Sequence, residues 1–147
     1  MTREDLIDAA RNAARHAHAP YSHYGVGAAL LLDDGRIVTG ANFENASYGL
    51  SLCAETVALA KASSEGDLRR VVAIAVIGGA LGADRALSGT EPVMPCGRCR
   101  QMLNESASLA QRDIIVHCSS ADGAAVETFH LSQLLPRAFG PGNLGIT

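Results

Sequence analysis

The chain has 147 residues, of which 48% are hydrophobic and 18% charged, and this composition fits one globular domain and excludes a disordered chain. A net charge of -3, the lack of a long Lys/Arg run and only 4% aromatic residues argue against the basic or base-stacking surface that nucleic-acid binding needs. No apolar run approaches the ~20 residues of a membrane span, and the N-terminus lacks the features of a secretory signal. We therefore expect a single domain over residues 1–147, a cytoplasmic location, and a small molecule as the partner, without nucleic acid or membrane.

The hydrophobic pattern predicts that the chain begins with a helix. Thr2 can cap this helix, apolar residues recur in it at helical spacing, and it should end near His18-Ala19-Pro20. A β-hairpin follows, because Asp33-Asp34-Gly35 is a turn signal between two short apolar runs at 26–32 and 36–40. The remaining predicted elements are a polar loop over 42–51, a helix over 52–62, a strand over 71–77, a loop over 78–91, a helix over 96–106, strands over 114–117 and 126–129, and a helical turn over 131–135. Strands that alternate with helices predict an α/β sandwich whose sheet is at least partly parallel.

Two short motifs carry candidate chemistry, Cys53-Ala54-Glu55 and Pro95-Cys96-Gly97-Arg98-Cys99. Both stand at the expected start of a helix, where free N–H groups and the helix dipole favour thiolate over thiol. Zinc binds thiolates, and Cys96 and Cys99 are one helical turn apart, so the sequence predicts a zinc site made of these two residues and Cys53. Three protein ligands leave the fourth position open for water, as in catalytic zinc sites.

Glu55 lies two residues after Cys53 and can border such a metal without binding it. A carboxylate in that place can take a proton from the water and deliver it to a substrate nitrogen. A zinc ligand with Glu two residues on, followed later by Pro-Cys-x-x-Cys, is the known signature of zinc nucleobase deaminases. The pattern therefore predicts Glu55 as the catalytic residue of a zinc hydrolase.

The chain resembles the small homotetrameric cytidine deaminases in motifs that occur in the same order. The motifs are Tyr21–Ala29, Asn42–Tyr48, Cys53–Glu55, Pro95–Gln101 and Leu134–Pro141. The resemblance implies a cytidine deaminase-like fold, a three-layer α/β/α sandwich around a mixed sheet of about five strands. It further implies one Zn²⁺ per subunit, hydrolysis of cytidine and deoxycytidine to uridine and deoxyuridine with release of ammonia, a role in pyrimidine salvage, and a homotetramer with sites completed across subunit interfaces.

The resemblance also assigns roles to individual residues. It implies that Asn42 and Glu44 bind the ribose 3′-hydroxyl, which an amide and a carboxylate can do together. It places Tyr24 near the base, and the backbone of Ala54 and Glu55 on the pyrimidine edge. The residues that it implies reach a neighbouring subunit's site are Ala46, Tyr48 and Phe139.

Two positions depart from the family pattern: Thr56 replaces the usual Arg after the glutamate, and Tyr24 replaces the more common Phe. Three thiolates give a zinc ion a net charge of -1, which weakens it as a Lewis acid and which the usual Arg partly offsets. Arg100, which matches another sulfur-contacting Arg of the family, and the Thr56 hydroxyl are the candidates for this tuning. We expect activity that is retained but altered.

Other functions remain open at this point. A related zinc deaminase acting on blasticidin S or a free base shares the Pro-Cys-x-x-Cys motif, although the Asn42–Glu44 pair favours a ribose substrate. A noncatalytic, zinc-stabilised interaction module requires a fourth protein ligand, for which Cys118 is the candidate, although a buried apolar thiol is its favoured role. A polynucleotide deaminase is disfavoured because the basic surface is missing.

Overall fold

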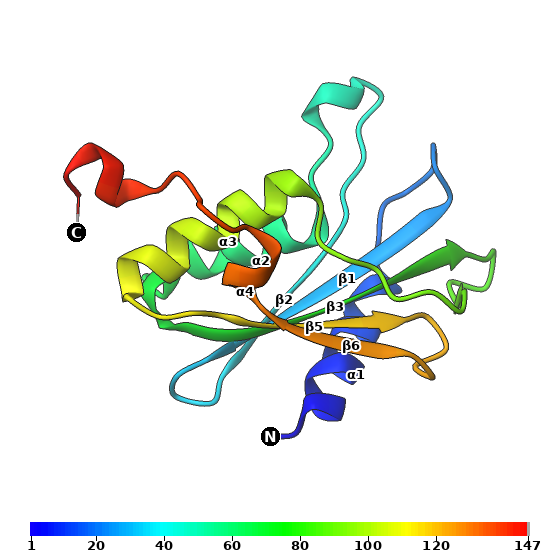
Figure 1. Cartoon of the computed structure of the whole chain (residues 1–147). Coiled ribbons are helices and arrows are strands. Elements are labelled where there is room, and N and C mark those ends of the chain that lie inside the picture. Colours follow the sequence, from blue (N-terminus) through cyan, green and yellow to red (C-terminus); the bar gives the residue numbers. More distant parts are fainter. Residues whose placement is uncertain (147) are drawn as a thin grey trace.

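A computed structural model describes residues 1–146 and contains a mixed β-sheet between two layers of helices (Figure 1). The helices are α1 (Arg3–Ala14), α2 (Ala54–Ser64), α3 (Gly97–Ala110) and α4 (Leu131–Leu134). The strands are β1 (Tyr24–Leu32), β2 (Ile37–Ala41), β3 (Val71–Leu81), β4 (Leu87–Ser88), β5 (Ile115–Ser120) and β6 (Val126–His130), and short 3₁₀ segments cover Tyr48–Leu50, Leu68–Arg70 and Pro141–Leu144. Within this part of the chain no helix combines the length and the apolar character needed to cross a membrane.

The sheet has the strand order β2-β1-β3-β5-β6, and the short β4 pairs with β3. Only the β3–β5 pair is parallel among the paired strands of the described chain, and the other pairs are antiparallel. A parallel pair needs a long crossover connection, and here that connection contains α3. The sheet is mixed, as expected. It has six strands where about five were expected, and the additional strand is the short β4.

Side chains from alternate positions of the strands fill two separate cores, because successive residues of a strand point to opposite faces. One core lies between the sheet and α1 and includes Leu6, Ala29 and Ile77. The other lies between the sheet and the α2–α3 layer and includes Leu30 and Leu103. Helices therefore cover both faces of the sheet, which confirms the three-layer α/β/α architecture (Figure 1).

Helix α2 packs unusually close to strand β2 at Gly40. A Cβ atom added to Gly40 would lie 2.6 Å from the backbone oxygen of Ala54 and 2.6 Å from the backbone nitrogen of Ala58. The missing side chain thus lets the first turn of α2 lie directly on the sheet. This contact fixes where α2 begins, and the candidate site is built at that beginning.

Four predicted element ends were wrong by three or four residues, among them those of α3, which runs to Ala110, and of β5, which runs to Ser120. The first helix ends at Ala14, so the buried Ala17 packs from the segment after the helix rather than from it. Strand β3 continues through the predicted loop to Leu81, where Ala80 pairs with Ser88. A Cβ atom on Gly79 would meet the Ser88 oxygen at 2.4 Å, so glycine here permits close strand pairing rather than marking a loop.

Candidate active site

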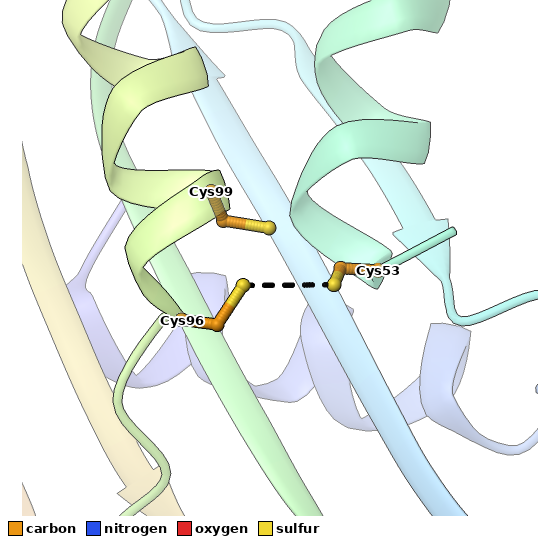
Figure 2. Close-up of side chains that lie close together, drawn as sticks. All are labelled: Cys53, Cys96 and Cys99. Atoms are coloured by element: carbon orange, nitrogen blue, oxygen red, sulfur yellow. Dashed lines mark hydrogen bonds between the residues drawn. The ribbon is translucent and has the colours of Figure 1, made fainter. Parts of the chain in front are cut away.

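The three motif cysteines meet where two helices begin (Figure 2). Cys53 is the N-cap of α2 and Cys96 is the N-cap of α3, while Cys99 lies in the first turn of α3. Their Sγ atoms all lie within 4.8 Å of one another, and those of Cys53 and Cys96 are 3.7 Å apart. The structure thus brings together, across 43 positions of sequence, the sulfurs that the motifs predicted.

The spacing of these sulfurs fits a zinc ion. Four ligands placed tetrahedrally at a Zn–S distance of about 2.3 Å are separated by roughly 3.8 Å, whereas a disulfide requires about 2.05 Å. The 3.7 Å between Cys53 and Cys96 agrees with the first value and not with the second. Among residues 1–146 these cysteines form the single group of potential metal ligands, so Cys118 and the histidines do not complete it.

The cysteine pKa values show that burial favours the protonated thiols, which a bound cation must ionise. Burial raises the pKa of the Cys53 thiol, and burial followed by the nearby Glu55 carboxylate raises that of Cys99. Burial also acts on Cys96, but the backbone N–H and the thiol of Cys99 outweigh it and leave the Cys96 pKa lowered. The helix N-termini favour the thiolate form, but they do not by themselves outweigh burial at Cys53 and Cys99, and a coordinated cation would supply the remaining stabilisation.

Cys118 lies in β5, away from the sulfur group, and is fully buried. Burial raises the pKa of its thiol to about 12, which keeps it protonated at neutral pH. It occupies the α2–α3 core among apolar side chains. These observations favour the buried apolar thiol over a fourth metal ligand.

Glu55 occupies the second position of α2 and is only 4% exposed. Burial is the main reason that the pKa of its carboxyl is raised, while its own backbone N–H and the Cys99 thiol oppose the shift. A carboxyl whose pKa is raised toward neutrality can both accept and release a proton during a reaction. Glu55 is therefore placed and tuned as a proton carrier beside the sulfurs.

A pocket of about 260 Å³ opens in front of Glu55, Cys53 and Cys96. It is lined by Val26, Asn42, Glu44, Ser51, Leu52, Cys53, Ala54, Glu55, Val93, Met94 and Cys96. Its volume lies slightly below the ~300–1,000 Å³ of typical small-molecule sites, which favours a small ligand. Of the apolar wall residues, the sequence predicted Ala54 but not Val26, Leu52, Val93 or Met94. Val93 and Met94 directly precede the Pro95 motif, so their position was a usable signal.

Asn42 and Glu44, the predicted sugar ligands, line this pocket and are both held by hydrogen bonds. The Asn42 amide accepts from the Val26 N–H at 2.9 Å and donates to the Tyr24 carbonyl at 2.9 Å. The Glu44 carboxylate accepts hydrogen bonds from the Tyr21 and Ser22 N–H groups and from the Ser22 hydroxyl. Partial burial acts to raise the pKa of Glu44, but these bonds outweigh it and hold the pKa below its ordinary value.

Four other predicted substrate residues do not line this pocket in the described part of the chain. Tyr24 and Ala46 are exposed, and Tyr48 and Phe139 have 74% and 59% of their surfaces exposed. The ring of Tyr48 contacts that of Tyr21 edge-on, at 5.7 Å between ring centroids. Ala54, by contrast, contributes to the pocket wall.

The two candidate tuning residues differ in what they contact. The Thr56 hydroxyl lies 3.5 Å from the Sγ of Cys99, so it is placed to donate to a thiolate there. The Arg100 guanidinium instead donates to the carbonyls of Pro95 at 2.8 Å and Leu134 at 3.0 Å. Arg100 thus supports the loop that leads into Cys96, whereas Thr56 touches a sulfur directly.

A glutamate that borders a three-sulfur zinc site without joining it is the arrangement used by zinc-dependent nucleobase deaminases, and fold and site together place the chain in that class. The family model of the cytidine and deoxycytidylate deaminase zinc-binding region matches residues 1–118. The chain belongs to this family, and zinc is its metal.

Relatives and solved structures agree with this assignment. The chain is 48% identical to the cytidine deaminase of Halalkalibacterium halodurans, with 95% of each chain covered, and 42% identical to that of Mycobacterium tuberculosis, with 92% of this chain and 87% of the relative covered. The crystal structure of the cytidine deaminase from Burkholderia pseudomallei is 40% identical and superimposes with a TM-score of 0.81, covering 95% of this chain and all of the other. The similarity therefore extends over the whole fold and not only over the metal motifs.

Proposed function

We propose that this chain catalyses the hydrolytic deamination of cytidine and deoxycytidine to uridine and deoxyuridine, with release of ammonia, on one zinc ion per chain. The observation that carries the proposal is that a single pocket joins Glu55 and two of the metal-binding cysteines, Cys53 and Cys96, to Asn42 and Glu44. One small ligand can therefore touch a proton carrier at one end and a pair of sugar-binding groups at the other. The cytidine deaminases among its relatives support the same activity.

Cys53, Cys96 and Cys99 would hold the zinc ion, which when bound supplies the Lewis acidity that makes water nucleophilic at neutral pH. Glu55 accepts a proton from the attacking water and delivers it to N3 of the pyrimidine. It then takes the second proton, from the hydroxyl now attached to C4, and delivers it to the amine nitrogen on the same carbon. Ammonia leaves only after that nitrogen has been protonated, so one mobile carrier must reach both atoms. The burial of Glu55 excludes bulk water and suits its carboxyl to this exchange.

Asn42 and Glu44 would bind the 3′-hydroxyl of the sugar, each with hydrogen-bonding capacity left beyond its contacts within the chain. The apolar walls formed by Val26, Leu52 and Val93 are suited to the flat base, whose edge the backbone of Ala54 would hold. This polar pair is what favours a nucleoside over a free base or blasticidin S.

We also propose that the working form is a homotetramer in which Ala46, Tyr48 and Phe139 of one chain approach the pocket of another, with Tyr24 near the base. Their exposure on the single chain supports this role, since large aromatic side chains at the surface are typical of interfaces. Sedimentation of the zinc-loaded protein tests it, because a mass of one chain would exclude shared sites. A Tyr48→Ala variant should then lose both assembly and activity.

We propose that residues 1–147 act as one deaminase domain, since both helical layers pack on the same sheet; the last residue of that range, Thr147, lies outside the described residues. A cytoplasmic location is proposed as well. It is supported by the need to keep the metal-binding cysteines reduced, which a reducing compartment provides.

The proposed activity is tested by measuring zinc content per chain together with ammonia release from cytidine, deoxycytidine, cytosine and blasticidin S. We expect one zinc per chain and turnover of the two nucleosides only. Turnover restricted to cytosine or blasticidin S would overturn the substrate assignment. A protein that binds zinc but releases no ammonia from any of these would instead support the noncatalytic module.

A further inference from the structure

The Glu44 carboxylate is held at both oxygens by the segment that precedes β1. Oε1 accepts from the N–H groups of Tyr21 and Ser22 at 3.1 and 3.2 Å, and Oε2 accepts from the Ser22 hydroxyl. The Ser22 oxygen also accepts a hydrogen bond from the Tyr24 N–H at 3.1 Å. The pocket is lined by Glu44 and, among the described residues, not by Ser22.

These contacts leave the Ser22 hydroxyl only one orientation. A backbone N–H can only donate, so the Ser22 oxygen must accept from Tyr24. An ionised carboxylate can only accept, so the hydroxyl proton must point to Glu44. The hydroxyl is thus a fixed donor, and it is the only donor to Oε2 among the described contacts.

The backbone around Glu44 is fixed independently of Ser22. The Glu44 N–H donates to the His18 carbonyl at 2.9 Å, and the His18 N–H donates to the Asn42 carbonyl at 3.0 Å. Loss of the Ser22 hydroxyl would therefore leave the backbone pairing of 18 with 42–44 intact. It would remove the donor to Oε2 and the acceptor of the Tyr24 N–H, and the carboxylate could then turn about Oε1, which the Tyr21 and Ser22 N–H groups still hold. The hydroxyl has a role in orientation that backbone pairing does not duplicate.

We propose that Ser22 is a positioning residue for sugar recognition: its hydroxyl sets the rotation of the Glu44 carboxylate so that the unused acceptor sites of that group face the 3′-hydroxyl of the nucleoside. This inference rests on the proposed deaminase function and extends it to a residue outside the pocket wall. Ser22 acts through Glu44, so its effect depends on whether the substrate carries the hydroxyl that Glu44 binds.

The test compares the wild type with Ser22→Ala on cytidine and on 3′-deoxycytidine. On cytidine we expect kcat/KM to fall about tenfold, mostly through KM with kcat changed by no more than about twofold. On 3′-deoxycytidine the two proteins should agree within about twofold, because the hydroxyl that Glu44 would bind is missing. If turnover of the 3′-deoxy nucleoside is too slow, its inhibition constant against cytidine gives the same comparison.

Ser132→Ala is a matched control, because Ser132 binds Asp113 with the same pair of groups, its N–H at 3.1 Å and its hydroxyl at 2.6 Å. It should leave both substrates unaffected. Ser22→Thr, which keeps the hydroxyl, should restore the preference for cytidine. Ser22→Cys, which keeps the size but donates weakly, should reproduce the alanine result and serves if Ser22→Ala does not fold.

Equal losses on both nucleosides would overturn the proposal, since they indicate a general structural role. An unchanged KM for cytidine in Ser22→Ala would overturn it as well. A wild-type protein that deaminates neither nucleoside overturns the proposed function and the Ser22 role with it, and this outcome is recognised from the wild type alone.

Discussion

The hydroxyl oxygen of Thr56 lies 3.5 Å from the Sγ of Cys99, and Thr56 is only 5% exposed. A thiolate bound to zinc has no proton, so the hydroxyl would be the donor in that contact. Such a bond withdraws charge from the sulfur and leaves the metal a stronger Lewis acid.

We expect Thr56→Val, which removes the hydroxyl and keeps the shape, to lower kcat by about tenfold and to weaken zinc binding. Steady-state kinetics and competition with a chelator measure the two effects. Thr56→Arg restores the residue usual in the family and should change kcat or zinc affinity relative to the parent. If neither substitution alters rate or zinc affinity, Thr56 does not tune the metal.

Glu55→Gln should retain the fold and bind one zinc ion, but its kcat should fall by ~10²–10⁴-fold. This is the usual contribution of proton transfer by a positioned side chain. The amide keeps the size of the side chain at this buried position and removes the proton carrier. Ammonia release and zinc content are measured on the same preparation. Activity close to that of the wild type would contradict the mechanism.

Zinc affinity should rise steeply with pH. The pKa values of Cys53 and Cys99 are raised by burial, so both thiols are protonated near pH 7 before zinc binds and must release their protons to it. With two or more protons released per zinc, the apparent affinity should increase about 100-fold or more per pH unit between pH 6 and 8. Calorimetry in buffers of different ionisation enthalpy counts the protons, and a value below one would contradict the assignment of these thiols as ligands.

Gly40→Ala should destabilise the protein by ~1–3 kcal/mol, the usual cost of overpacking, and should also lower activity. The added Cβ would lie 2.6 Å from the backbone of α2 and push away the helix that begins beside Cys53. Gly142→Ala is the control, because nothing lies within 4 Å of a Cβ at that position. Chemical unfolding and turnover distinguish the two variants, and equal behaviour would show that the close packing at Gly40 is unimportant.

The metal site could be predicted from the sequence because its information is local. Cys53 and Cys96 each stand at a helix N-cap, and Cys99 follows one turn later, so each motif is visible locally. The signature of zinc nucleobase deaminases then joins the two motifs into one site. The α/β class was equally visible in the alternation of apolar strands and helices. The extension of β3 was not, because Gly78 and Gly79 read locally as loop and only the facing β4 reveals why glycine is needed.

What the sequence left undetermined depends on contacts between distant segments. The hold of Ser22 on Glu44 spans 22 positions and has no local pattern. The Arg100 side chain has the charge to stabilise sulfur, yet it donates to carbonyls of Pro95 and Leu134 because the C-terminal segment lies within its reach. Residue type indicated what these side chains could do, and only the packing determined which partner each received.

The separation of 43 positions between Cys53 and Cys96 also orders events during synthesis. At ~5–20 residues per second the first thiol leaves the ribosome about 2–9 seconds before the second. A nascent chain in that interval has only one of the three cysteine ligands. Metal insertion must therefore wait until α3, which carries the other two, has emerged and packed against the sheet. Zinc acquisition is then a step that follows the docking of α3, so the metal cannot nucleate the elements that precede this helix.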